Sequence, residues 1–250
     1  MNNERLIEYA DAFAFLGNSL LKPMSQTQDI GLDPEFWLAF PKFDSDLVVE
    51  YIGRCTEFAD GAFVAASMGR DMVEEVSVEY TKLFIGPPAP VAPPWETMNR
   101  EEGVSVGFGQ PTIDMQNILR DMGLEVSNDN NQYADHIGLE LLTLSEMCRR
   151  AAKRSDAGAD AVEIETCSDE AGEELGEPGV LGESEAALSA VNGEAERYTS
   201  VDQICAFIVE HPLGWISNLH DKVYDRFESG YYVGILALAK ALMETFVQQD

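Results

Sequence analysis

Positively charged residues are scarce in this 250-residue chain. It contains 16 Lys and Arg against 45 Asp and Glu, which gives a formal net charge of −29 at pH 7. Recognition of nucleic-acid phosphates depends on Lys and Arg, so the composition argues against a nucleic-acid partner. A basic partner would be attracted instead, although a high negative charge also keeps a protein in solution.

Cysteines and long apolar runs are also sparse. The four cysteines, Cys55, Cys148, Cys167 and Cys205, lie far apart without a CxxC pair, which predicts neither a disulfide framework nor a structural metal site. No apolar run approaches the roughly 18 residues of a membrane span, and the N-terminus lacks the basic and apolar segments of a secretory signal. A reducing cytoplasm is therefore the expected location.

Familiar catalytic motifs are missing as well. The chain has no GxxxxGK[ST] phosphate loop, no GxGxxG after a strand and no GxSxG elbow. His136 follows Asp135 and precedes Glu140 by four residues, so one helix could bring the three together as a metal or acid/base site. A metal-dependent hydrolase that uses these residues is the less favoured alternative. Glu140 and Glu146 are interpreted as a solvated edge of that helix.

Apolar residues spaced by three and four positions predict an all-α protein, a single bundle of about ten helices. Asp33 and Ser200 are predicted N-caps, the latter within a capping box. No segment shows the sustained alternation of a strand. Helices are expected at 4–21, 34–40, 46–67, 71–84, 111–121, 131–153, 201–211, 213–227 and 230–247.

A strongly acidic segment interrupts this pattern. Between Ser155 and Glu196 there are thirteen Asp or Glu, six Gly and no Lys or Arg. Few large apolar residues are present to offset the entropy lost on ordering. We therefore expect an N-terminal helical part at 1–154, a flexible acidic insertion or hinge at 155–197, and a C-terminal helical hairpin at 198–250 that completes the same domain.

A proline-rich loop is the most informative feature. The twelve residues from Ile85 to Glu96 include five prolines and Trp95. Proline fixes φ and donates no backbone hydrogen bond, so this segment should be extended and rigid after the helix that precedes it. Trp37 and Trp215 are expected in the core. The prolines beside Trp95 indicate instead a rigid apolar wall that docks a peptide.

Three segments resemble the TorD/DmsD family, whose members are cytoplasmic all-helical chaperones for molybdenum-containing oxidoreductases. The segments are Tyr80-x-x-Leu83-Phe84-x-Gly86-Pro87 through Pro93-Pro94-Trp95-Glu96-Thr97, then Asp135-His136-Ile137-Gly138-Leu139-Glu140-Leu141, then His211-x-Leu213-x-Trp215 with Tyr231-Tyr232-Val233-Gly234-Ile235-Leu236. The resemblance implies binding of the client's twin-arginine signal peptide, assistance in cofactor insertion and delay of export. We expect no cofactor of the chaperone's own and no catalytic residue.

The resemblance also implies a peptide site. Its apolar wall would include Trp95, with Asp135 or nearby carboxylates accepting the two arginines. The segment Glu96 to Asn99 departs from the family pattern, and we expect this edge to read the identity of the client. The implied site residues are Leu83, Phe84, Gly86, Pro87, Pro93, Pro94, Trp95, Asp135 and His136.

Two further alternatives remain open at this point. The client of such a chaperone is either an exported enzyme of the DMSO/TMAO-reductase type or a nitrate-reductase-type enzyme without an exported signal. The oligomeric state is either a monomer or a domain-swapped dimer.

Overall fold

Helices dominate the computed structural model, which describes residues 1–100, 106–126, 132–160, 188–190 and 198–249. The all-α prediction is confirmed. In chain order the helices are α1 Asn3–Leu21, α2 Pro34–Ala39, α3 Asp46–Ser67, α4 Met72–Tyr80, α5 Thr97–Arg100, α6 Gln110–Asp121, α7 Ile137–Asp160, α8 Val201–Glu210, α9 Ile216–Arg226 and α10 Tyr231–Gln248.

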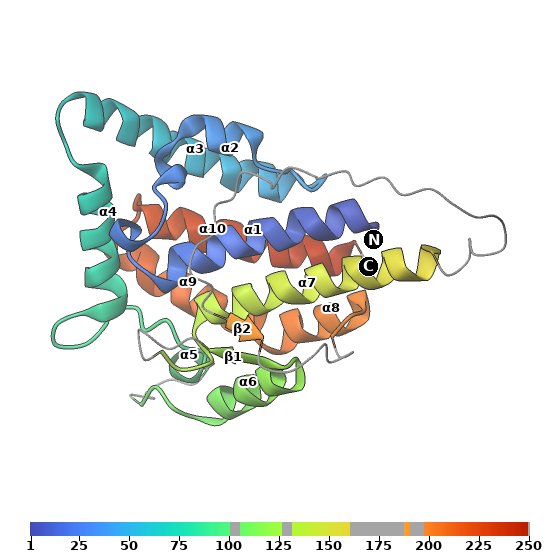
Figure 1. The fold of residues 1–250 in the computed structure, drawn as a ribbon. Coiled ribbons are helices and arrows are strands. Elements are labelled where there is room, and N and C mark those ends of the chain that lie inside the picture. The colour runs from blue at the N-terminus through green and yellow to red at the C-terminus, as the bar shows by residue number, and fades with distance from the viewer. Residues whose placement is uncertain (101–105, 127–131, 161–187, 191–197, 250) are drawn as a thin grey trace.

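The centre of the fold is formed by α1, α7 and α10 (Figure 1). Helices α1 and α7 approach closely where two glycines meet. A Cβ on Gly17 would lie 2.8 Å from the carbonyl oxygen of Gly138, and a Cβ on Gly138 would lie 2.8 Å from that of Gly17. The two helices can therefore touch backbone to backbone only because neither position carries a side chain.

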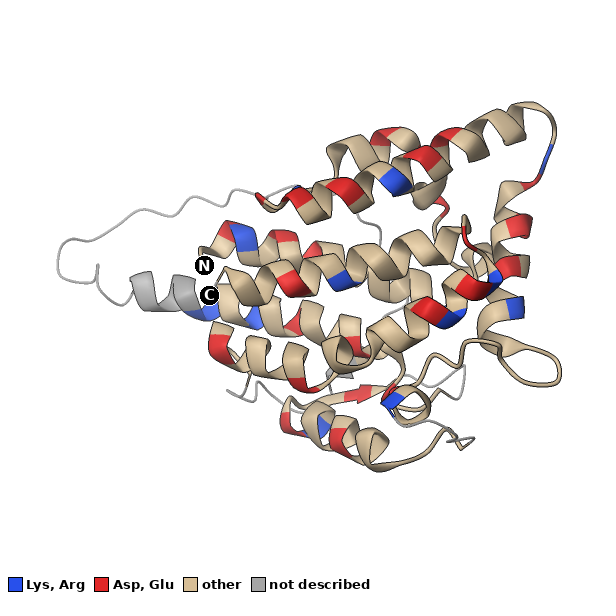
Figure 2. Ribbon diagram, turned by 180° about the vertical axis from the view of Figure 1, so that it is seen from behind, with Lys and Arg blue, Asp and Glu red and all other residues tan. Residues whose placement is uncertain are grey.

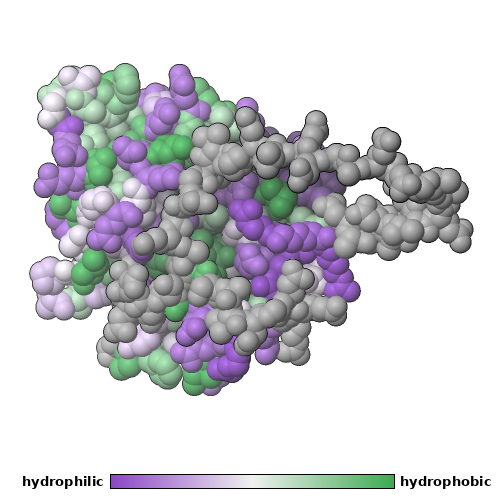
Figure 3. All heavy atoms as spheres, in the orientation of Figure 1, coloured by the Kyte–Doolittle hydropathy of each residue, from purple (hydrophilic) through white to green (hydrophobic). Residues whose placement is uncertain are grey.

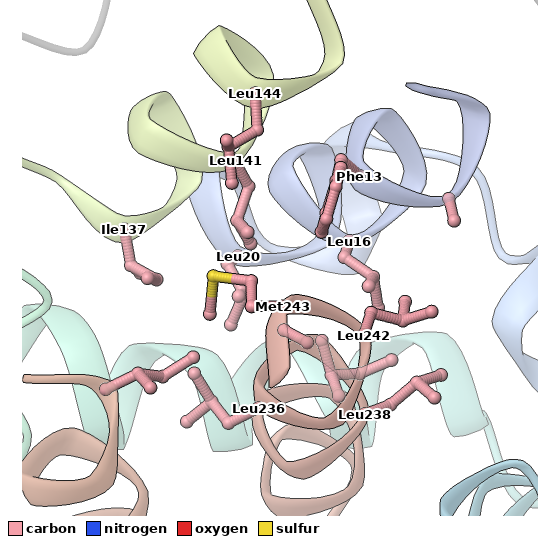
Figure 4. Packing of buried hydrophobic residues seen from close by; sticks show 14 of the residues in the cluster. Phe13, Leu16, Leu20, Ile137, Leu141, Leu144, Leu236, Leu238, Leu242 and Met243 are labelled. Carbon is pink, nitrogen blue, oxygen red and sulfur yellow. The ribbon is translucent and has the colours of Figure 1, made fainter. Parts of the chain in front are cut away.

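Large aliphatic and aromatic side chains fill the space between these three helices. Figure 4 shows them converging from α1, α7 and α10. The same buried cluster includes residues on both sides of the acidic segment, and it contains Trp37 and Trp215 as predicted. The labelled residues are Phe13, Leu16, Leu20, Ile137, Leu141, Leu144, Leu236, Leu238, Leu242 and Met243.

Side-chain caps begin the helices where the sequence indicated. The carboxylate of Asp33 accepts the Glu35 N–H at the start of α2, and Asp71 accepts the Glu74 N–H at the start of α4. Ser200 opens α8 with the predicted capping box. Such caps satisfy N–H groups that have no partner within the helix.

One cap joins distant parts of the chain. The buried carboxylate of Glu79, near the end of α4, accepts the N–H groups of Tyr231 and Tyr232 at 3.2 and 3.1 Å. These N–H groups begin α10, so Glu79 satisfies the first turn of the last helix. Burial raises the pKa of Glu79, while the two hydrogen bonds act in the opposite direction.

Two expectations about secondary structure are wrong. The helix expected at 131–153 begins at Ile137 and continues to Asp160. Two three-residue strands, β1 Leu124–Val126 and β2 Leu188–Ala190, pair in antiparallel fashion, although no strand was predicted. Three residues are too few to show alternation. Both α7 and β2 enter the expected acidic insertion, whose residues 161–187 and 191–197 lie outside the described residues.

The surface mixes residue classes on the face seen in Figure 3, where hydrophobic and hydrophilic residues are interspersed. In the part of the chain that the structure describes, no helix combines the length and the apolar character needed to cross a bilayer.

Candidate functional site

The proline-rich loop projects from the end of α4 (Figures 1 and 2). A five-residue π-helical turn, Thr81–Ile85, leads from α4 to Gly86. Gly86 has a φ of +85°, and a Cβ there would lie 2.4 Å from the backbone of Ala89. A glycine is therefore required to turn the chain into the loop. Within the loop, Ile85 and Val91 are 55% and 49% exposed.

The two side chains that precede the loop do not face solvent. Leu83 is completely buried and Phe84 is 3% exposed. The Phe84 ring packs against Tyr80 and Tyr232, with centroids 5.1 and 5.3 Å apart. Direct contact of Leu83 and Phe84 with a peptide is thus not supported, because both side chains are used to anchor the loop in the core.

The end of the loop pairs with the segment that begins α7. Ile137 N–H donates to the Pro94 carbonyl at 2.9 Å, and Glu96 N–H donates to the Asp135 carbonyl at 2.9 Å. Trp95 and His136 consequently lie opposite each other in an isolated antiparallel bridge. Two segments about forty residues apart in the sequence therefore form one structural unit. The family resemblance implied that these two segments lie close together.

Asp135 is fully buried within this unit. Its carboxylate accepts the Thr97 N–H at 3.0 Å, the Thr97 hydroxyl at 2.6 Å and the Thr112 hydroxyl at 2.9 Å. Burial raises the pKa of Asp135, and these hydrogen bonds oppose the effect. Both oxygens are occupied, so the expected contact between Asp135 and a client arginine is not supported by the geometry. Asp135 instead holds α5 and α6 together.

His136 is also fully buried, and its ring nitrogens differ. Nδ1 accepts the Gly138 N–H at 3.0 Å. Burial lowers the pKa of His136 to about 3, so the ring is neutral at pH 7 and Nε2 must carry its single proton. Among the described residues, Nε2 of His136 has no hydrogen-bond partner.

Trp95 shows a second buried donor without an acceptor. The half-buried ring lies edge-on to Tyr133 and His136, with centroids 6.1 and 6.2 Å away. The described residues provide no partner for its buried Nε1–H. Two neighbouring rings thus each bury an unsatisfied N–H, and each such group costs roughly 1–3 kcal/mol. An arrangement of this kind calls for an explanation beyond packing.

A buried carboxylate network lies beneath the same segment. Glu96 and Glu140 are both fully buried. Glu96 forms an ion pair with Arg100 and lies 3.1 Å from Nδ1 of His211. Glu140 accepts the Trp215 Nε1–H at 3.1 Å through one oxygen, and among the described residues its other oxygen has no hydrogen-bond partner. The network joins α5 and α7 to the turn between α8 and α9.

The two buried carboxyls differ in protonation, because their neighbours shift the two pKa values in opposite directions. Burial and the nearby carboxylates of Glu96 and Asp135 raise the pKa of Glu140 well above its ordinary value. Burial acts in the same direction on Glu96, but His211 and Arg100 outweigh it and lower the pKa of Glu96. We therefore assign a proton to Glu140, whereas Glu96 is ionised.

Two sequence interpretations are overturned by this network. Glu140 is not part of a solvated edge, whereas Glu146 is half-buried and pairs with Arg150 at 2.7 Å. The edge expected to read client identity is inside the protein, since Glu96 is 0%, Thr97 9% and Asn99 4% exposed. The sequence around Glu96 and Glu140 did not indicate their burial, because their partners, His211 and Trp215, are far away in the chain.

An open cavity of about 590 Å³ adjoins the network. Its wall includes three carboxylates, Glu96, Asp114 and Glu210, together with one cation, Arg100. Arg100 is already bonded to Glu96 and to the Glu210 carbonyl. The remaining lining residues include the exposed ring of Phe108. This cavity therefore offers carboxylates and an aromatic ring to a ligand beside the proline loop.

The hydrolase alternative requires a different geometry. Asp135 has both oxygens occupied by threonine groups, and Nδ1 of His136 accepts a backbone N–H. Within the described ranges, no group of three or more His, Cys, Asp or Glu residues is arranged to hold a metal ion. The three residues of the proposed hydrolase site serve instead to hold the loop, α5 and α9 in place.

Comparison with known proteins decides the family. A model of the family described as nitrate reductase delta subunit matches residues 48–175, just over half of the chain. The chain is also similar to the Tat proofreading chaperone DmsD of Salmonella typhi and to that of Salmonella typhimurium strain LT2. Each is 35% identical over 81 residues, 32% of this chain. This protein belongs to the TorD/DmsD family.

Members of the TorD/DmsD family are chaperones and not enzymes, which also argues against the hydrolase. The aligned region spans 38% of the length of each curated DmsD relative. No solved structure matches this TorD/DmsD chain significantly. The family resemblance inferred from the three motifs is confirmed.

Proposed function

We propose that this protein is a cytoplasmic chaperone that binds the twin-arginine signal peptide of a molybdenum-containing oxidoreductase of the DMSO/TMAO-reductase type. In this role it assists cofactor insertion and prevents premature export. The name of the similar DmsD proteins, Tat proofreading chaperone, supports this role. The observation that carries the proposal is the unsatisfied Nε1–H of Trp95, whose half-buried ring lies at the end of the exposed loop.

A bound peptide would supply the acceptor that the Trp95 Nε1–H lacks, because a backbone carbonyl can accept a hydrogen bond from it. The apolar part of the peptide would lie against the exposed loop residues Ile85 and Val91, together with Pro87 and the ring of Trp95. Extended, proline-rich walls beside an aromatic ring are a recurrent mode of peptide recognition. Leu83, Phe84, Gly86, Pro93 and Pro94 act as the support that shapes this wall.

The arginines of the peptide require acceptors other than Asp135. Asp114 and Glu210 line the cavity next to Thr97, and their carboxylates would form charge-assisted hydrogen bonds with guanidinium groups. Asp135 and His136 would then position the site from beneath. An affinity near micromolar, on the order of −8 kcal/mol, would allow the peptide to be released to the export machinery.

The Trp95→Phe variant tests the proposal with little change of shape. It removes the Nε1–H and keeps an aromatic ring, so we expect titrated signal-peptide binding to weaken by about fivefold to tenfold. The thermal stability should remain unchanged or rise, because the unsatisfied donor is removed. The matched control is Trp37→Phe, whose Nε1–H donates to the Gly31 carbonyl in the core. That variant should lose stability and keep its affinity.

A second pair of variants tests the exposed wall. Ile85→Ser with Val91→Ser should weaken peptide binding, whereas Leu38→Ser, at a position that is 70% exposed on α2, should not. If the loop variant and Trp95→Phe both bind the signal peptide as the parent protein does, the assignment of the site is incorrect.

A nitrate-reductase-type client without an exported signal is the second candidate. The description of the matching family model, nitrate reductase delta subunit, favours it. Co-purification of the client followed by its N-terminal sequencing separates the candidates. A client that carries a twin-arginine leader supports the first, and a client without one supports the second.

A further inference from the structure

Helix α5 is a single turn that directly follows the proline-rich loop, and its side chains contact several parts of the fold. Thr97 donates to the Asp135 carboxylate, and Arg100 donates to the Glu210 carbonyl. A second buried residue of this turn is Asn99, which is 4% exposed. A buried amide needs a partner for each of its polar atoms, so the contacts of Asn99 show what it holds in place.

The amide nitrogen of Asn99 binds the end of the proline-rich loop. Nδ2 donates to the Pro93 carbonyl at 2.7 Å and to the Trp95 carbonyl at 2.8 Å. An amide nitrogen carries two hydrogens, so both are used on the loop. The carbonyl between these two, that of Pro94, accepts the Ile137 N–H at 2.9 Å. Three successive carbonyls are therefore held, which fixes the backbone from which the Trp95 ring projects.

The amide oxygen of Asn99 is bound from α9. The half-buried Lys222 donates from Nζ to Asn99 Oδ1 at 2.8 Å, across 123 positions of sequence. An ammonium group can only donate hydrogen bonds, so Lys222 selects the amide orientation that turns the oxygen to α9 and the NH₂ group to the loop. A hydrogen bond from an ionised donor is stronger than one between neutral groups, which makes this selection firm.

The position of Asn99 requires an amide. A carboxylate of the same size has no hydrogen to donate, and a hydroxyl has a single one, whereas the loop takes two. A second contact from α9 has a different character. Asn218 donates from Nδ2 to the backbone carbonyl of Asn99 at 2.7 Å. This hydrogen bond ties α9 to α5 but does not involve the side-chain amide, so it provides a matched comparison.

We propose that Asn99, held in its orientation by Lys222, is the residue that positions Trp95 for peptide binding. A buried N–H that points away from the acceptor of a ligand stays unpaired in the complex and weakens binding, so the direction of the Trp95 ring sets the affinity. Asn99 acts through Trp95 and is a positioning residue. The positioning is argued from the contacts above, and its effect on affinity rests on the function proposed above.

The indole N–H resonances test the positioning without any ligand. The chain has three tryptophans, and the indole resonance that disappears from the ¹H–¹⁵N spectrum of Trp95→Phe belongs to Trp95. Asn99→Asp keeps an acceptor for Lys222 but places a carboxylate oxygen against the carbonyls of Pro93 and Trp95. This variant should shift the Trp95 resonance and leave the other two in place, which also shows that the core is folded.

Peptide binding provides the second readout. The probe is a fluorescent synthetic peptide with two arginines ahead of a leucine–alanine stretch, titrated by anisotropy. Asn99→Asp should weaken its binding at least about tenfold, although the added negative charge alone would favour a cationic peptide. Lys222→Met keeps both donors of Asn99 and removes the cation that orients them, so it should shift the Trp95 resonance less and weaken binding about threefold. The control, Asn218→Ala, should change neither readout.

The outcomes separate the positioning role from the chaperone role. An unmoved Trp95 resonance in folded Asn99→Asp overturns the proposal, and so does an equal shift in Asn218→Ala. If Asn99→Asp does not fold, the same two criteria apply to Lys222→Met. A moved resonance with unchanged peptide affinity also overturns the proposal where Trp95→Phe weakens binding. Where Trp95→Phe binds normally as well, the function proposed above has failed, and the moved resonance still supports Asn99 as the residue that positions Trp95.

Discussion

Replacing Glu140 with Gln should stabilise the protein at neutral pH. The side chain of Glu140 is fully buried and accepts the Trp215 Nε1–H, and burial and the nearby carboxylates of Glu96 and Asp135 raise its pKa. A glutamine keeps an oxygen for Trp215 and is uncharged at every pH. Glutamine therefore resembles the protonated form of Glu140, but it does not titrate.

The direction of the effect follows from the raised pKa of Glu140. In the unfolded chain a glutamic acid ionises near pH 4.3, and in the folded protein burial raises the pKa. Between these two pKa values the folded state binds the additional proton, so the stability contributed by this group falls as pH rises. Each tenfold difference between the two acid constants corresponds to about 1.4 kcal/mol. We expect Glu140→Gln to be more stable than the parent by about 1–3 kcal/mol at pH 8 and equal to it near pH 4.

Glu140→Ala provides the contrasting perturbation. It leaves the buried Trp215 N–H without an acceptor, which costs roughly 1–3 kcal/mol, and creates a cavity that adds to the loss. We expect a loss of about 3–4 kcal/mol near pH 4, and a loss smaller by about 1–3 kcal/mol at pH 8, because the parent itself becomes less stable as Glu140 is forced to ionise.

Urea denaturation from pH 4 to pH 8 measures these differences, provided that the m-value stays constant. The contribution of Glu96, whose pKa is lowered, has the opposite sign and is lost as pH falls; it is expected to remain in the glutamine variant. If Glu140→Gln is less stable than the parent at pH 8, or if the difference between them does not change from pH 4 to pH 8, the pKa of Glu140 is not raised in the folded protein.

The other buried contacts predict further stability changes. Asp135→Ala should lower the free energy of unfolding by about 2–4 kcal/mol, because three donors lose a buried acceptor, whereas Asp135→Asn should cost less since one acceptor oxygen remains. A large loss of peptide affinity with unchanged stability in Asp135→Ala would instead support direct recognition. Gly138→Ala should cost about 2 kcal/mol or more, because its Cβ would meet a carbonyl of α1. Gly230→Ala should cost about 1–3 kcal/mol by displacing the Glu79 carboxylate, 2.4 Å from the added Cβ. Equilibrium unfolding checks both, and a change below about 0.5 kcal/mol in either would contradict the close approach.

Local sequence signals predicted the helices well. The N-caps Asp33, Asp71 and Ser200 each act within three residues of their own helix, so their effect can be recognised from spacing alone. The start of α7 was placed too early for the opposite reason. Asp135 and His136 pair with the end of the proline-rich loop, and nothing in their own neighbourhood indicates that tertiary contact.

The sequence predicted which segments lie together at the candidate site, but not which of their side chains are buried and bonded within the protein. The sequence motifs brought Trp95 and Asp135 together, and the structure places them on adjoining segments. Burial of Glu96 and Glu140 could not be predicted, because each depends on a partner far away in the chain, His211 and Trp215 respectively. An isolated charged residue is interpreted as exposed by default, and only the folded arrangement identifies such exceptions.

The cap that Glu79 places on α10 bears on when the protein becomes competent during synthesis. Glu79 lies just before the proline-rich loop. It accepts hydrogen bonds from Tyr231 and Tyr232, which follow it in the sequence by 152 and 153 positions. Contacts of such long sequence separation form late, since the intervening chain must be closed into a loop. A ribosome-bound chain that lacks Tyr231 and Tyr232 would therefore display the prolines without fixing α4 in position. Client capture is expected to begin only after the last helix has emerged.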